Sequence, residues 1–228
     1  MSIAIFFSGR ITGFQYLDTL KLIKEKYNPT FFCSLNADSI TDEMSLFFKT
    51  FDLSKDQYNI EKTIVPPIYF TLDKCPVTNV ANTYSMFYHN KKCFELIEKY
   101  PQKFDVILKF RADIDASMPL EIISPLPNTV YIPFSDFWDS TDHEHGGTND
   151  RIAYGDFNTM KLYCGAVDNI LKFCYGYKTS LIKSLNIIKN KDKIWFHPES
   201  INGKQIRYSK LNIVGFKYKC SLSPKRHI

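Results

Sequence analysis

Apolar runs alternate with amphipathic stretches at the start of the chain, the pattern of strand–helix–strand units. The apolar run at residues 3–7 predicts a buried parallel strand. Apolar residues then recur at helical spacing as far as Tyr27, and Pro29 ends that helix. A second strand is predicted over residues 30–35. This order of elements predicts an open α/β sheet.

The middle of the chain carries weaker strand signals and one long helical pattern. We expect a short helix over residues 42–48, a strand near residues 62–65 and a loop over residues 69–79. Apolar residues at helical spacing predict a long helix over residues 80–100. The apolar run FDVILKF at residues 104–110 is the strongest strand signal in the sequence.

The C-terminal half continues the alternation without repeats or low-complexity linkers, so we expect one domain over residues 1–228. Asp156 is suited to cap a helix that begins at residue 157. A short helix is expected after residue 199. The other predicted elements are a long helix over residues 167–188, a polar loop over 135–149, and strands at 130–132, 152–154 and 211–216.

Composition narrows the class of protein. With 44% hydrophobic and 23% charged residues, the chain is an ordinary globular protein. Its net charge of +5 is not gathered into a basic stripe, which disfavours nucleic-acid binding and fits a small anionic substrate or an anionic surface. The six cysteines form no Cys-x-x-Cys pair, and neither a secretory leader nor a membrane-spanning stretch is visible. We therefore expect reduced thiols and a cytoplasmic location.

Polar clusters follow three of the predicted strands. They contain Ser8, Gly9 and Arg10 after the first strand, Asn36 and Asp38 after the second, and Arg111, Asp113 and Asp115 after the strand at 104–110. In open α/β sheets, ligands bind beyond the carboxyl ends of the strands. We therefore expect these clusters to converge on a ligand site.

Asp113 and Asp115 are the candidate metal ligands. In an extended backbone, side chains two residues apart point the same way, so these carboxylates would share a cation. Mg²⁺ or Mn²⁺ prefers oxygen ligands, often takes only one or two from protein, and would leave room for a substrate diphosphate. The alternative is a plain Asp-rich turn, but the position after the strongest strand signal in an α/β pattern favours the metal site. Arg111 faces the opposite side if the strand continues, or turns toward phosphate if it does not.

The clusters after the first two strands each have a structural alternative. Gly9 allows close backbone approach and Arg10 can bind a phosphate bidentately, although Ser8-Gly9-Arg10 is equally consistent with a simple turn. It is not a Gly-x-Gly-x-x-Gly fingerprint, which disfavours a dinucleotide-binding fold. Asn36 and Asp38 could hydrogen-bond a base or ribose, or could serve only as turn formers.

Later in the chain, Asp150 is a candidate general base that takes a proton from an acceptor hydroxyl, with a helix or strand cap as the alternative. Three acids in the preceding loop compete for that role: Asp136, Asp139 and Asp142. His197 and Glu199 precede the short helix, where the imidazole could contact phosphate or metal. A proline-led helix start with an acid in its first turn explains them at least as well.

Four blocks carry a resemblance to a known family: FDVILKFRADID, VYIP, GGTNDRIAYGDFNTMKLYC and WFHPES. In this order and spacing they resemble small GT-A-type glycosyltransferase-like proteins of capsule and lipopolysaccharide gene clusters and of large DNA viruses. The match runs over most of the chain, from Ser8 to the tail. The resemblance implies a GT-A-like Rossmann-type mixed sheet flanked by helices. It also implies an Asp-x-Asp site for Mn²⁺ or Mg²⁺ and a nucleotide-diphosphate sugar donor, with UDP-sugar favoured.

The resemblance also assigns roles to individual residues. It implies that Asp113 and Asp115 are the Asp-x-Asp metal pair and that Arg111 is the arginine that precedes it. Asp150 would stand near the acceptor, and His197 and Glu199 would belong to the His-Pro-Glu block. The chain lacks the C-terminal membrane-binding helix of some proteins with this fold. A glycan or another hydroxyl compound is therefore expected as acceptor rather than a membrane lipid.

The sequence thus predicts a metal-dependent glycosyltransferase that inverts the anomeric carbon with Asp150 as base. A retaining reaction needs no such base and stays open, as do the sugar and the oligomeric state. One alternative is a sugar nucleotidyltransferase, which normally carries a Gly-rich loop with Lys or Arg after the first strand. Another is a non-catalytic nucleotide- or glycan-binding protein, which the intact Asp113 and Asp115 disfavour. For a viral protein, the expected location is the host cytoplasm.

Overall fold

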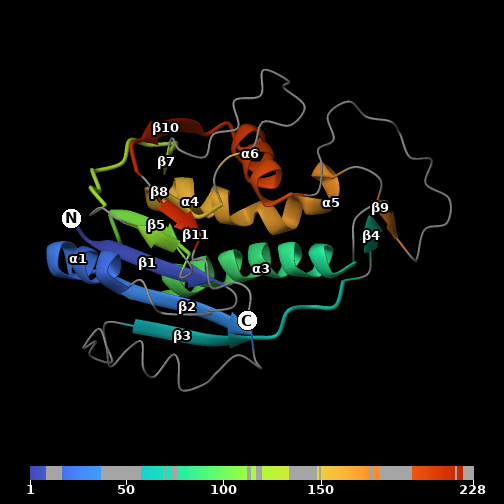
Figure 1. The fold of residues 1–228 in the computed structure, drawn as a ribbon, viewed down its shortest axis with the longest axis horizontal. Coiled ribbons are helices and arrows are strands. Elements are labelled where there is room, and N and C mark those ends of the chain that lie inside the picture. Colours follow the sequence, from blue (N-terminus) through green and yellow to red (C-terminus); the bar gives the residue numbers. More distant parts are fainter. Residues whose placement is uncertain are drawn as a thin grey trace.

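The computed structural model describes most of the chain, with gaps between the described segments. The described residues are 1–8, 17–36, 58–68, 70–72, 77–111, 114–116, 120–133, 148, 150–174, 177–179, 197–218 and 220–222. They form a single α/β domain in which helices flank a mixed sheet (Figure 1). The predicted helix at 42–48 lies outside the described residues, as does the loop at 135–149 apart from residue 148.

The described elements follow one another along the chain, with a 3-10 helix labelled η3. In order they are β1 (Ile3–Ser8), α1 (Leu17–Tyr27), β2 (Thr30–Asn36), β3 (Tyr58–Thr63), β4 (Phe70–Leu72), α3 (Val77–Lys99), β5 (Val106–Phe110), β6 (Ile114–Ala116), β7 (Thr129–Pro133), β8 (Ile152–Gly155), α4 (Phe157–Cys164), η3 (Gly165–Asn169), α5 (Ile170–Phe173), β9 (Tyr177–Thr179), α6 (Pro198–Tyr208), β10 (Asn212–Phe216) and β11 (Cys220–Leu222).

The central sheet has seven strands in the order β10-β7-β8-β5-β1-β2-β3. The strands β3, β2, β1 and β5 run parallel to one another. Strand β8 is antiparallel to both of its neighbours, β5 and β7, and β10 runs parallel to β7. The expected mixed α/β sheet flanked by helices is therefore confirmed.

Alternating side chains bury both faces of the sheet. In β1, Ile5 and Phe7 face the side covered by α1, where they pack with Ile23. Ala4 and Phe6 face the opposite side, which is covered by α3, α4 and α6 (Figure 1). Because both faces are covered, the central strands are continuous apolar runs, the feature that made them predictable from the sequence.

Two predictions near the edge of the sheet are wrong. The strand expected at residues 62–65 ends at Thr63 and begins at Tyr58, in register with β2. The strand β3 lies at the edge of the sheet and its sequence YNIEKT is mostly polar, which gives a weak strand signal. Ile64, beyond its end, is 80% exposed. The expected loop at 69–79 contains β4 and the first turn of α3, which begins at Val77.

The long helix expected over residues 167–188 is also wrong. The chain forms η3 and then the short α5, and Cys174 is extended with φ −91° and ψ 148°. Residues 177–179 then pair antiparallel with β4 as β9. Apolar residues three and four apart, such as Val167 and Ile170, are buried equally well by 3-10 and α-helical turns, so the pattern did not show where the helix stops. Residues 180–188 lie outside the described part.

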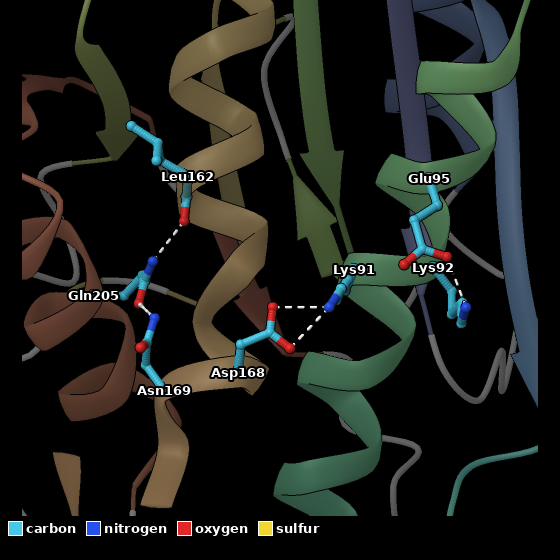
Figure 2. Close-up of polar contacts among 7 residues, drawn as sticks. All are labelled: Lys91, Lys92, Glu95, Leu162, Asp168, Asn169 and Gln205. Atoms are coloured by element: carbon cyan, nitrogen blue, oxygen red, sulfur yellow. Dashed lines mark hydrogen bonds and ion pairs between the residues drawn. The ribbon is translucent and has the colours of Figure 1, made fainter. Parts of the chain in front are cut away.

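Side-chain hydrogen bonds join the helices on the α3 face of the sheet (Figure 2). Gln205 of α6 donates from Nε2 to the carbonyl oxygen of Leu162 at 2.6 Å and accepts from Asn169 at 3.1 Å. Lys91 of α3 pairs with both carboxylate oxygens of Asp168 at 2.8 Å. These contacts fix α4, η3 and α6 relative to one another and to α3.

Candidate functional site

The order of the strands in the sheet reverses between β1 and β5. The chain proceeds from β1 to β2 on one side, and β5 joins on the other side, so the strand order reverses at this point. In open α/β sheets, ligands bind at such a switch point, outside the carboxyl ends of the strands. Phe6 is in register with Lys109, and two residues further on stand Ser8 and Arg111. The strands that precede the predicted polar clusters, β1, β2 and β5, are therefore neighbours as expected.

Several predicted site residues fall outside what the structure describes. Gly9, Arg10, Asp38 and Asp113 lie outside the described residues. The last residue of β2 is Asn36, and Asp115 lies in β6 in register with Ser221 of β11. For Asn36 and Asp115 the structure gives the backbone alone. Their roles stay predictions.

Arg111 and Asp150 form an ion pair just beyond β5. Arg111 Nη1 donates to Asp150 Oδ2 at 2.7 Å, with the arginine side chain 19% and the aspartate side chain 5% exposed. The backbone N–H of Arg111 also donates to the carbonyl oxygen of Arg151 at 3.0 Å. The sequence singled out both residues without linking them, and the structure brings them together.

Lys109, which sequence reasoning did not single out, contacts Asp150 from within β5. It is fully buried in β5 and donates from Nζ to the backbone carbonyl oxygen of Asp150. Burial lowers the pKa of Lys109 to about 8, and the Asp150 charge opposes that shift. The available signal was a lysine inside an apolar strand, two residues before Arg111.

The start of α6 adjoins the same region. The backbone N–H of Thr148 donates to the carbonyl oxygen of Glu199 at 3.0 Å. His197 Nδ1 lies 2.5 Å from Glu199 Oε2, an ion pair when the imidazole is protonated. Glu199 is also one of the charges that act on Lys109. Pro198 opens the helix with Glu199 in its first turn, so the structural interpretation of this block holds and the predicted ligand role stays open.

Several buried polar groups near this region have no hydrogen-bond partner. They are the hydroxyl of Thr148, both amide atoms of Asn202 and the hydroxyl of Tyr163. Burial raises the pKa of Tyr163 well above its usual value, and the Asp150 charge adds to this shift. Leaving such groups unmatched costs about 1–3 kcal/mol each, so buried polar surface of this kind usually binds ordered water.

A second cluster of polar side chains joins α3 to β1, β2 and β3 by hydrogen bonds. The hydroxyl of Ser8 donates to Asn90 Oδ1 at 2.5 Å. The hydroxyl of Ser34 lies 2.8 Å from His89 Nδ1 and 2.7 Å from the hydroxyl of Thr63. Burial lowers the pKa of His89 to about 4, so the imidazole is neutral at pH 7. Ser8, predicted to line the ligand site, thus has a structural contact.

The described cysteines are unsuited to catalysis. Cys33, Cys93, Cys164 and Cys174 are buried and form no disulfide. Burial raises the pKa of Cys33 and of Cys164 to about 12, which keeps both as thiols at neutral pH.

Within the described residues, no group of three or more His, Cys, Asp or Glu side chains is placed to hold a metal ion. The metal site at Asp113 and Asp115 stays a prediction. None of the described helices combines the length and the apolar character that crossing a membrane requires. No protein-family model matches the chain, and no curated protein matches it.

Proposed function

We propose that this protein is a metal-dependent glycosyltransferase of the GT-A type, which moves a sugar from a nucleotide-diphosphate donor to a hydroxyl acceptor. The observation that carries the proposal is the Arg111–Asp150 ion pair at the switch point between β1 and β5. This pair stands at the end of the strand that leads into Asp113 and Asp115. The position is the one at which open α/β sheets bind nucleotides.

The charges around Lys109 favour a cation next to the predicted carboxylate pair. The charges that act on Lys109 come from the cation Arg111 and from two acids, Asp150 and Glu199. Asp113 and Asp115 would add two more negative charges on the segment that continues from β5. Carboxylate oxygens are the ligands that Mg²⁺ and Mn²⁺ prefer, and a divalent ion would compensate that excess. The donor set therefore fits the proposed metal.

In the proposed reaction, the side chains of this protein would bind the metal, orient a carboxylate and accept one proton. Asp113 and Asp115 would hold the metal, whose chemistry is to neutralise charge on the leaving diphosphate. Asp150 accepts the proton of the acceptor hydroxyl as the sugar is transferred, which gives inversion. Arg111 orients the Asp150 carboxylate through its bond to Oδ2.

Calorimetric titration tests donor binding. UDP, GDP, CDP and dTDP are titrated with and without Mn²⁺ into the wild type and into the double variant Asp113→Ala/Asp115→Ala. Asp168→Ala is the matched control, because this carboxylate is exposed and belongs to η3. We expect one diphosphate to bind only with metal, to lose binding in the double variant and to keep it in the control. The proposal is contradicted if none of the four nucleotides binds, or if the affinity is the same without Mn²⁺ and in the double variant.

Turnover separates the proposed enzyme from its alternatives. With a saturating concentration of the sugar donor of the nucleotide that binds, Asp150→Asn should lower transfer by about 10²–10⁴-fold, the usual contribution of a general base. Release of pyrophosphate from a nucleoside triphosphate and a sugar phosphate would instead indicate a nucleotidyltransferase. Nucleotide binding without any turnover of sugar donors would indicate a binding protein.

A further inference from the structure

Lys109 is a buried cation whose charge the proposed reaction does not use. It lies in the covered centre of the sheet with 1% of its surface exposed. Its ammonium donates to the backbone carbonyl oxygen of Asp150, and no carboxylate of the described residues lies within ion-pair distance of it. Such a group destabilises a fold, because its lost hydration is not replaced by an opposite charge in contact.

Burial has a measurable effect on this lysine. Desolvation lowers the pKa of Lys109 to about 8, Asp150 raises it and Arg111 lowers it, with smaller contributions from Cys164 and Glu199 that raise it. A methionine of similar length would fill the same space without this cost. A lysine at this position therefore does not serve the stability of the fold, and we look for its role in the candidate site.

The contacts of Lys109 and Arg111 converge on one short segment. Lys109 belongs to β5, and Arg111 follows its last residue, Phe110, directly. Lys109 holds the backbone carbonyl oxygen of Asp150, and Arg111 holds its carboxylate. The backbone N–H of Arg111 adds a third bond, to the carbonyl oxygen of Arg151. Of these three bonds, only the one from Lys109 holds the backbone of Asp150, and it is lost when the ammonium is removed.

We propose that Lys109 is a positioning residue, whose buried ammonium fixes the Asp150 backbone so that the Arg111–Asp150 pair stays aligned at the switch point. Diphosphate binding there depends on the charge of Lys109, a consequence that rests on the proposed function. The charge is present below about pH 8 and is lost above it. Affinity for the diphosphate therefore decreases as the pH rises through that value.

A ligand-free measurement tests the positioning role directly. The ¹³C shift of the Asp150 carbonyl and the ¹⁵N shift of the Arg151 amide are followed by NMR from pH 7 to above the pKa of about 8. In the wild type both shifts should titrate with a midpoint near that pKa, and in Lys109→Met neither should. Lys161→Met, which removes an exposed lysine of α4, is the control and should titrate like the wild type. The protonation of Lys109 is followed in the same samples through its own ¹³Cε shift. If Lys109 titrates while the Asp150 carbonyl and Arg151 amide shifts stay flat, the proposal is overturned, and this arm needs no variant to fold.

Three further readouts separate positioning from a merely structural role. Lys109→Met should melt within a few degrees of the wild type, but exchange the Arg111 amide hydrogen faster at the same pH. With UDP and Mn²⁺ as probe, it should bind about tenfold or more weakly at neutral pH, without the alkaline decrease of the wild type. Lys109→Arg, which keeps the charge, should restore part of the affinity. Unchanged amide exchange and unchanged affinity in Lys109→Met would refute the inference.

The two proposals fail in different ways. If the wild type binds none of the nucleotides, the proposed function fails, while the carbonyl titration and amide exchange still decide the role of Lys109. If the wild type binds a nucleotide with metal and Lys109→Met binds it equally well at every pH, the proposed function stands and the inference about Lys109 fails.

Discussion

Gln205 holds three helical segments together through one buried amide, and its replacement by leucine should be costly. Its Nε2 donates to the carbonyl oxygen of Leu162 at 2.6 Å and to the hydroxyl of Ser209 at 3.1 Å. Its Oε1 accepts from Asn169 at 3.1 Å (Figure 2). Leucine has nearly the same volume, so Gln205→Leu removes these bonds while it leaves the packing almost unchanged.

The magnitude follows from the bonds that are lost. Each contributes roughly 1 kcal/mol net, and the Leu162 carbonyl and the Asn169 amide would lose a partner. We expect Gln205→Leu to lower the free energy of unfolding by about 2–4 kcal/mol. For a chain of this size, that loss corresponds to roughly 4–16 °C in melting temperature.

Lys91→Met is the matched control, because the Lys91–Asp168 pair joins neighbouring helices through comparably short contacts (Figure 2). Its side chains are 37% and 57% exposed, so water replaces the lost contact and the expected cost is about 0–1 kcal/mol. The assay is urea unfolding of both variants and the wild type, followed by circular dichroism at pH 7. If Gln205→Leu loses no more stability than Lys91→Met, the reasoning that burial decides the value of these contacts is refuted.

Two further predictions concern His89 and the cap of α4. Burial lowers the pKa of His89 from 6.5 to about 4, so its contribution to stability is complete above pH 6.5 and is lost as the pH falls toward 4, by about 3 kcal/mol in all. Urea unfolding at several pH values should show a steeper acid loss for the wild type than for His89→Gln, and equal slopes would contradict the assignment. Asp156 accepts from the backbone N–H of Thr159 at 2.7 Å, so Asp156→Ala should cost about 1 kcal/mol of stability. Asp156→Asn, which keeps an acceptor oxygen, should cost less, and an equal loss in both variants would exclude the cap as the cause.

The sequence was informative where burial and local spacing coincide. The apolar runs of β1, β2 and β5 identified the central strands because both faces of the sheet are covered there. The helical spacing of apolar residues likewise identified α3, and Asp156 caps α4 as expected. It failed for the bounds of the outer strand β3, whose mostly polar sequence YNIEKT carries little strand signal.

The candidate site was predictable only in part for a related reason. Residue type and the position after a strand were enough to single out Arg111 and Asp150, since these are local features of the sequence. Their contact joins positions 39 residues apart, and it depends on β8 being placed antiparallel beside β5. The role of Lys109 could not be inferred either, because a lysine in an apolar strand becomes informative only when its depth and its acceptor are known.

The sequence by itself thus determined the α/β class, the buried central strands and the residues at their carboxyl ends. Each of these follows from periodicity or chemistry over a few consecutive residues. Tertiary structure decided the strand order, the end of the helical pattern at Phe173 and the grouping of Lys109 and Arg111 around Asp150. These features depend on which distant segments pack together, and that choice is made by the free energy of the whole chain rather than by any local pattern.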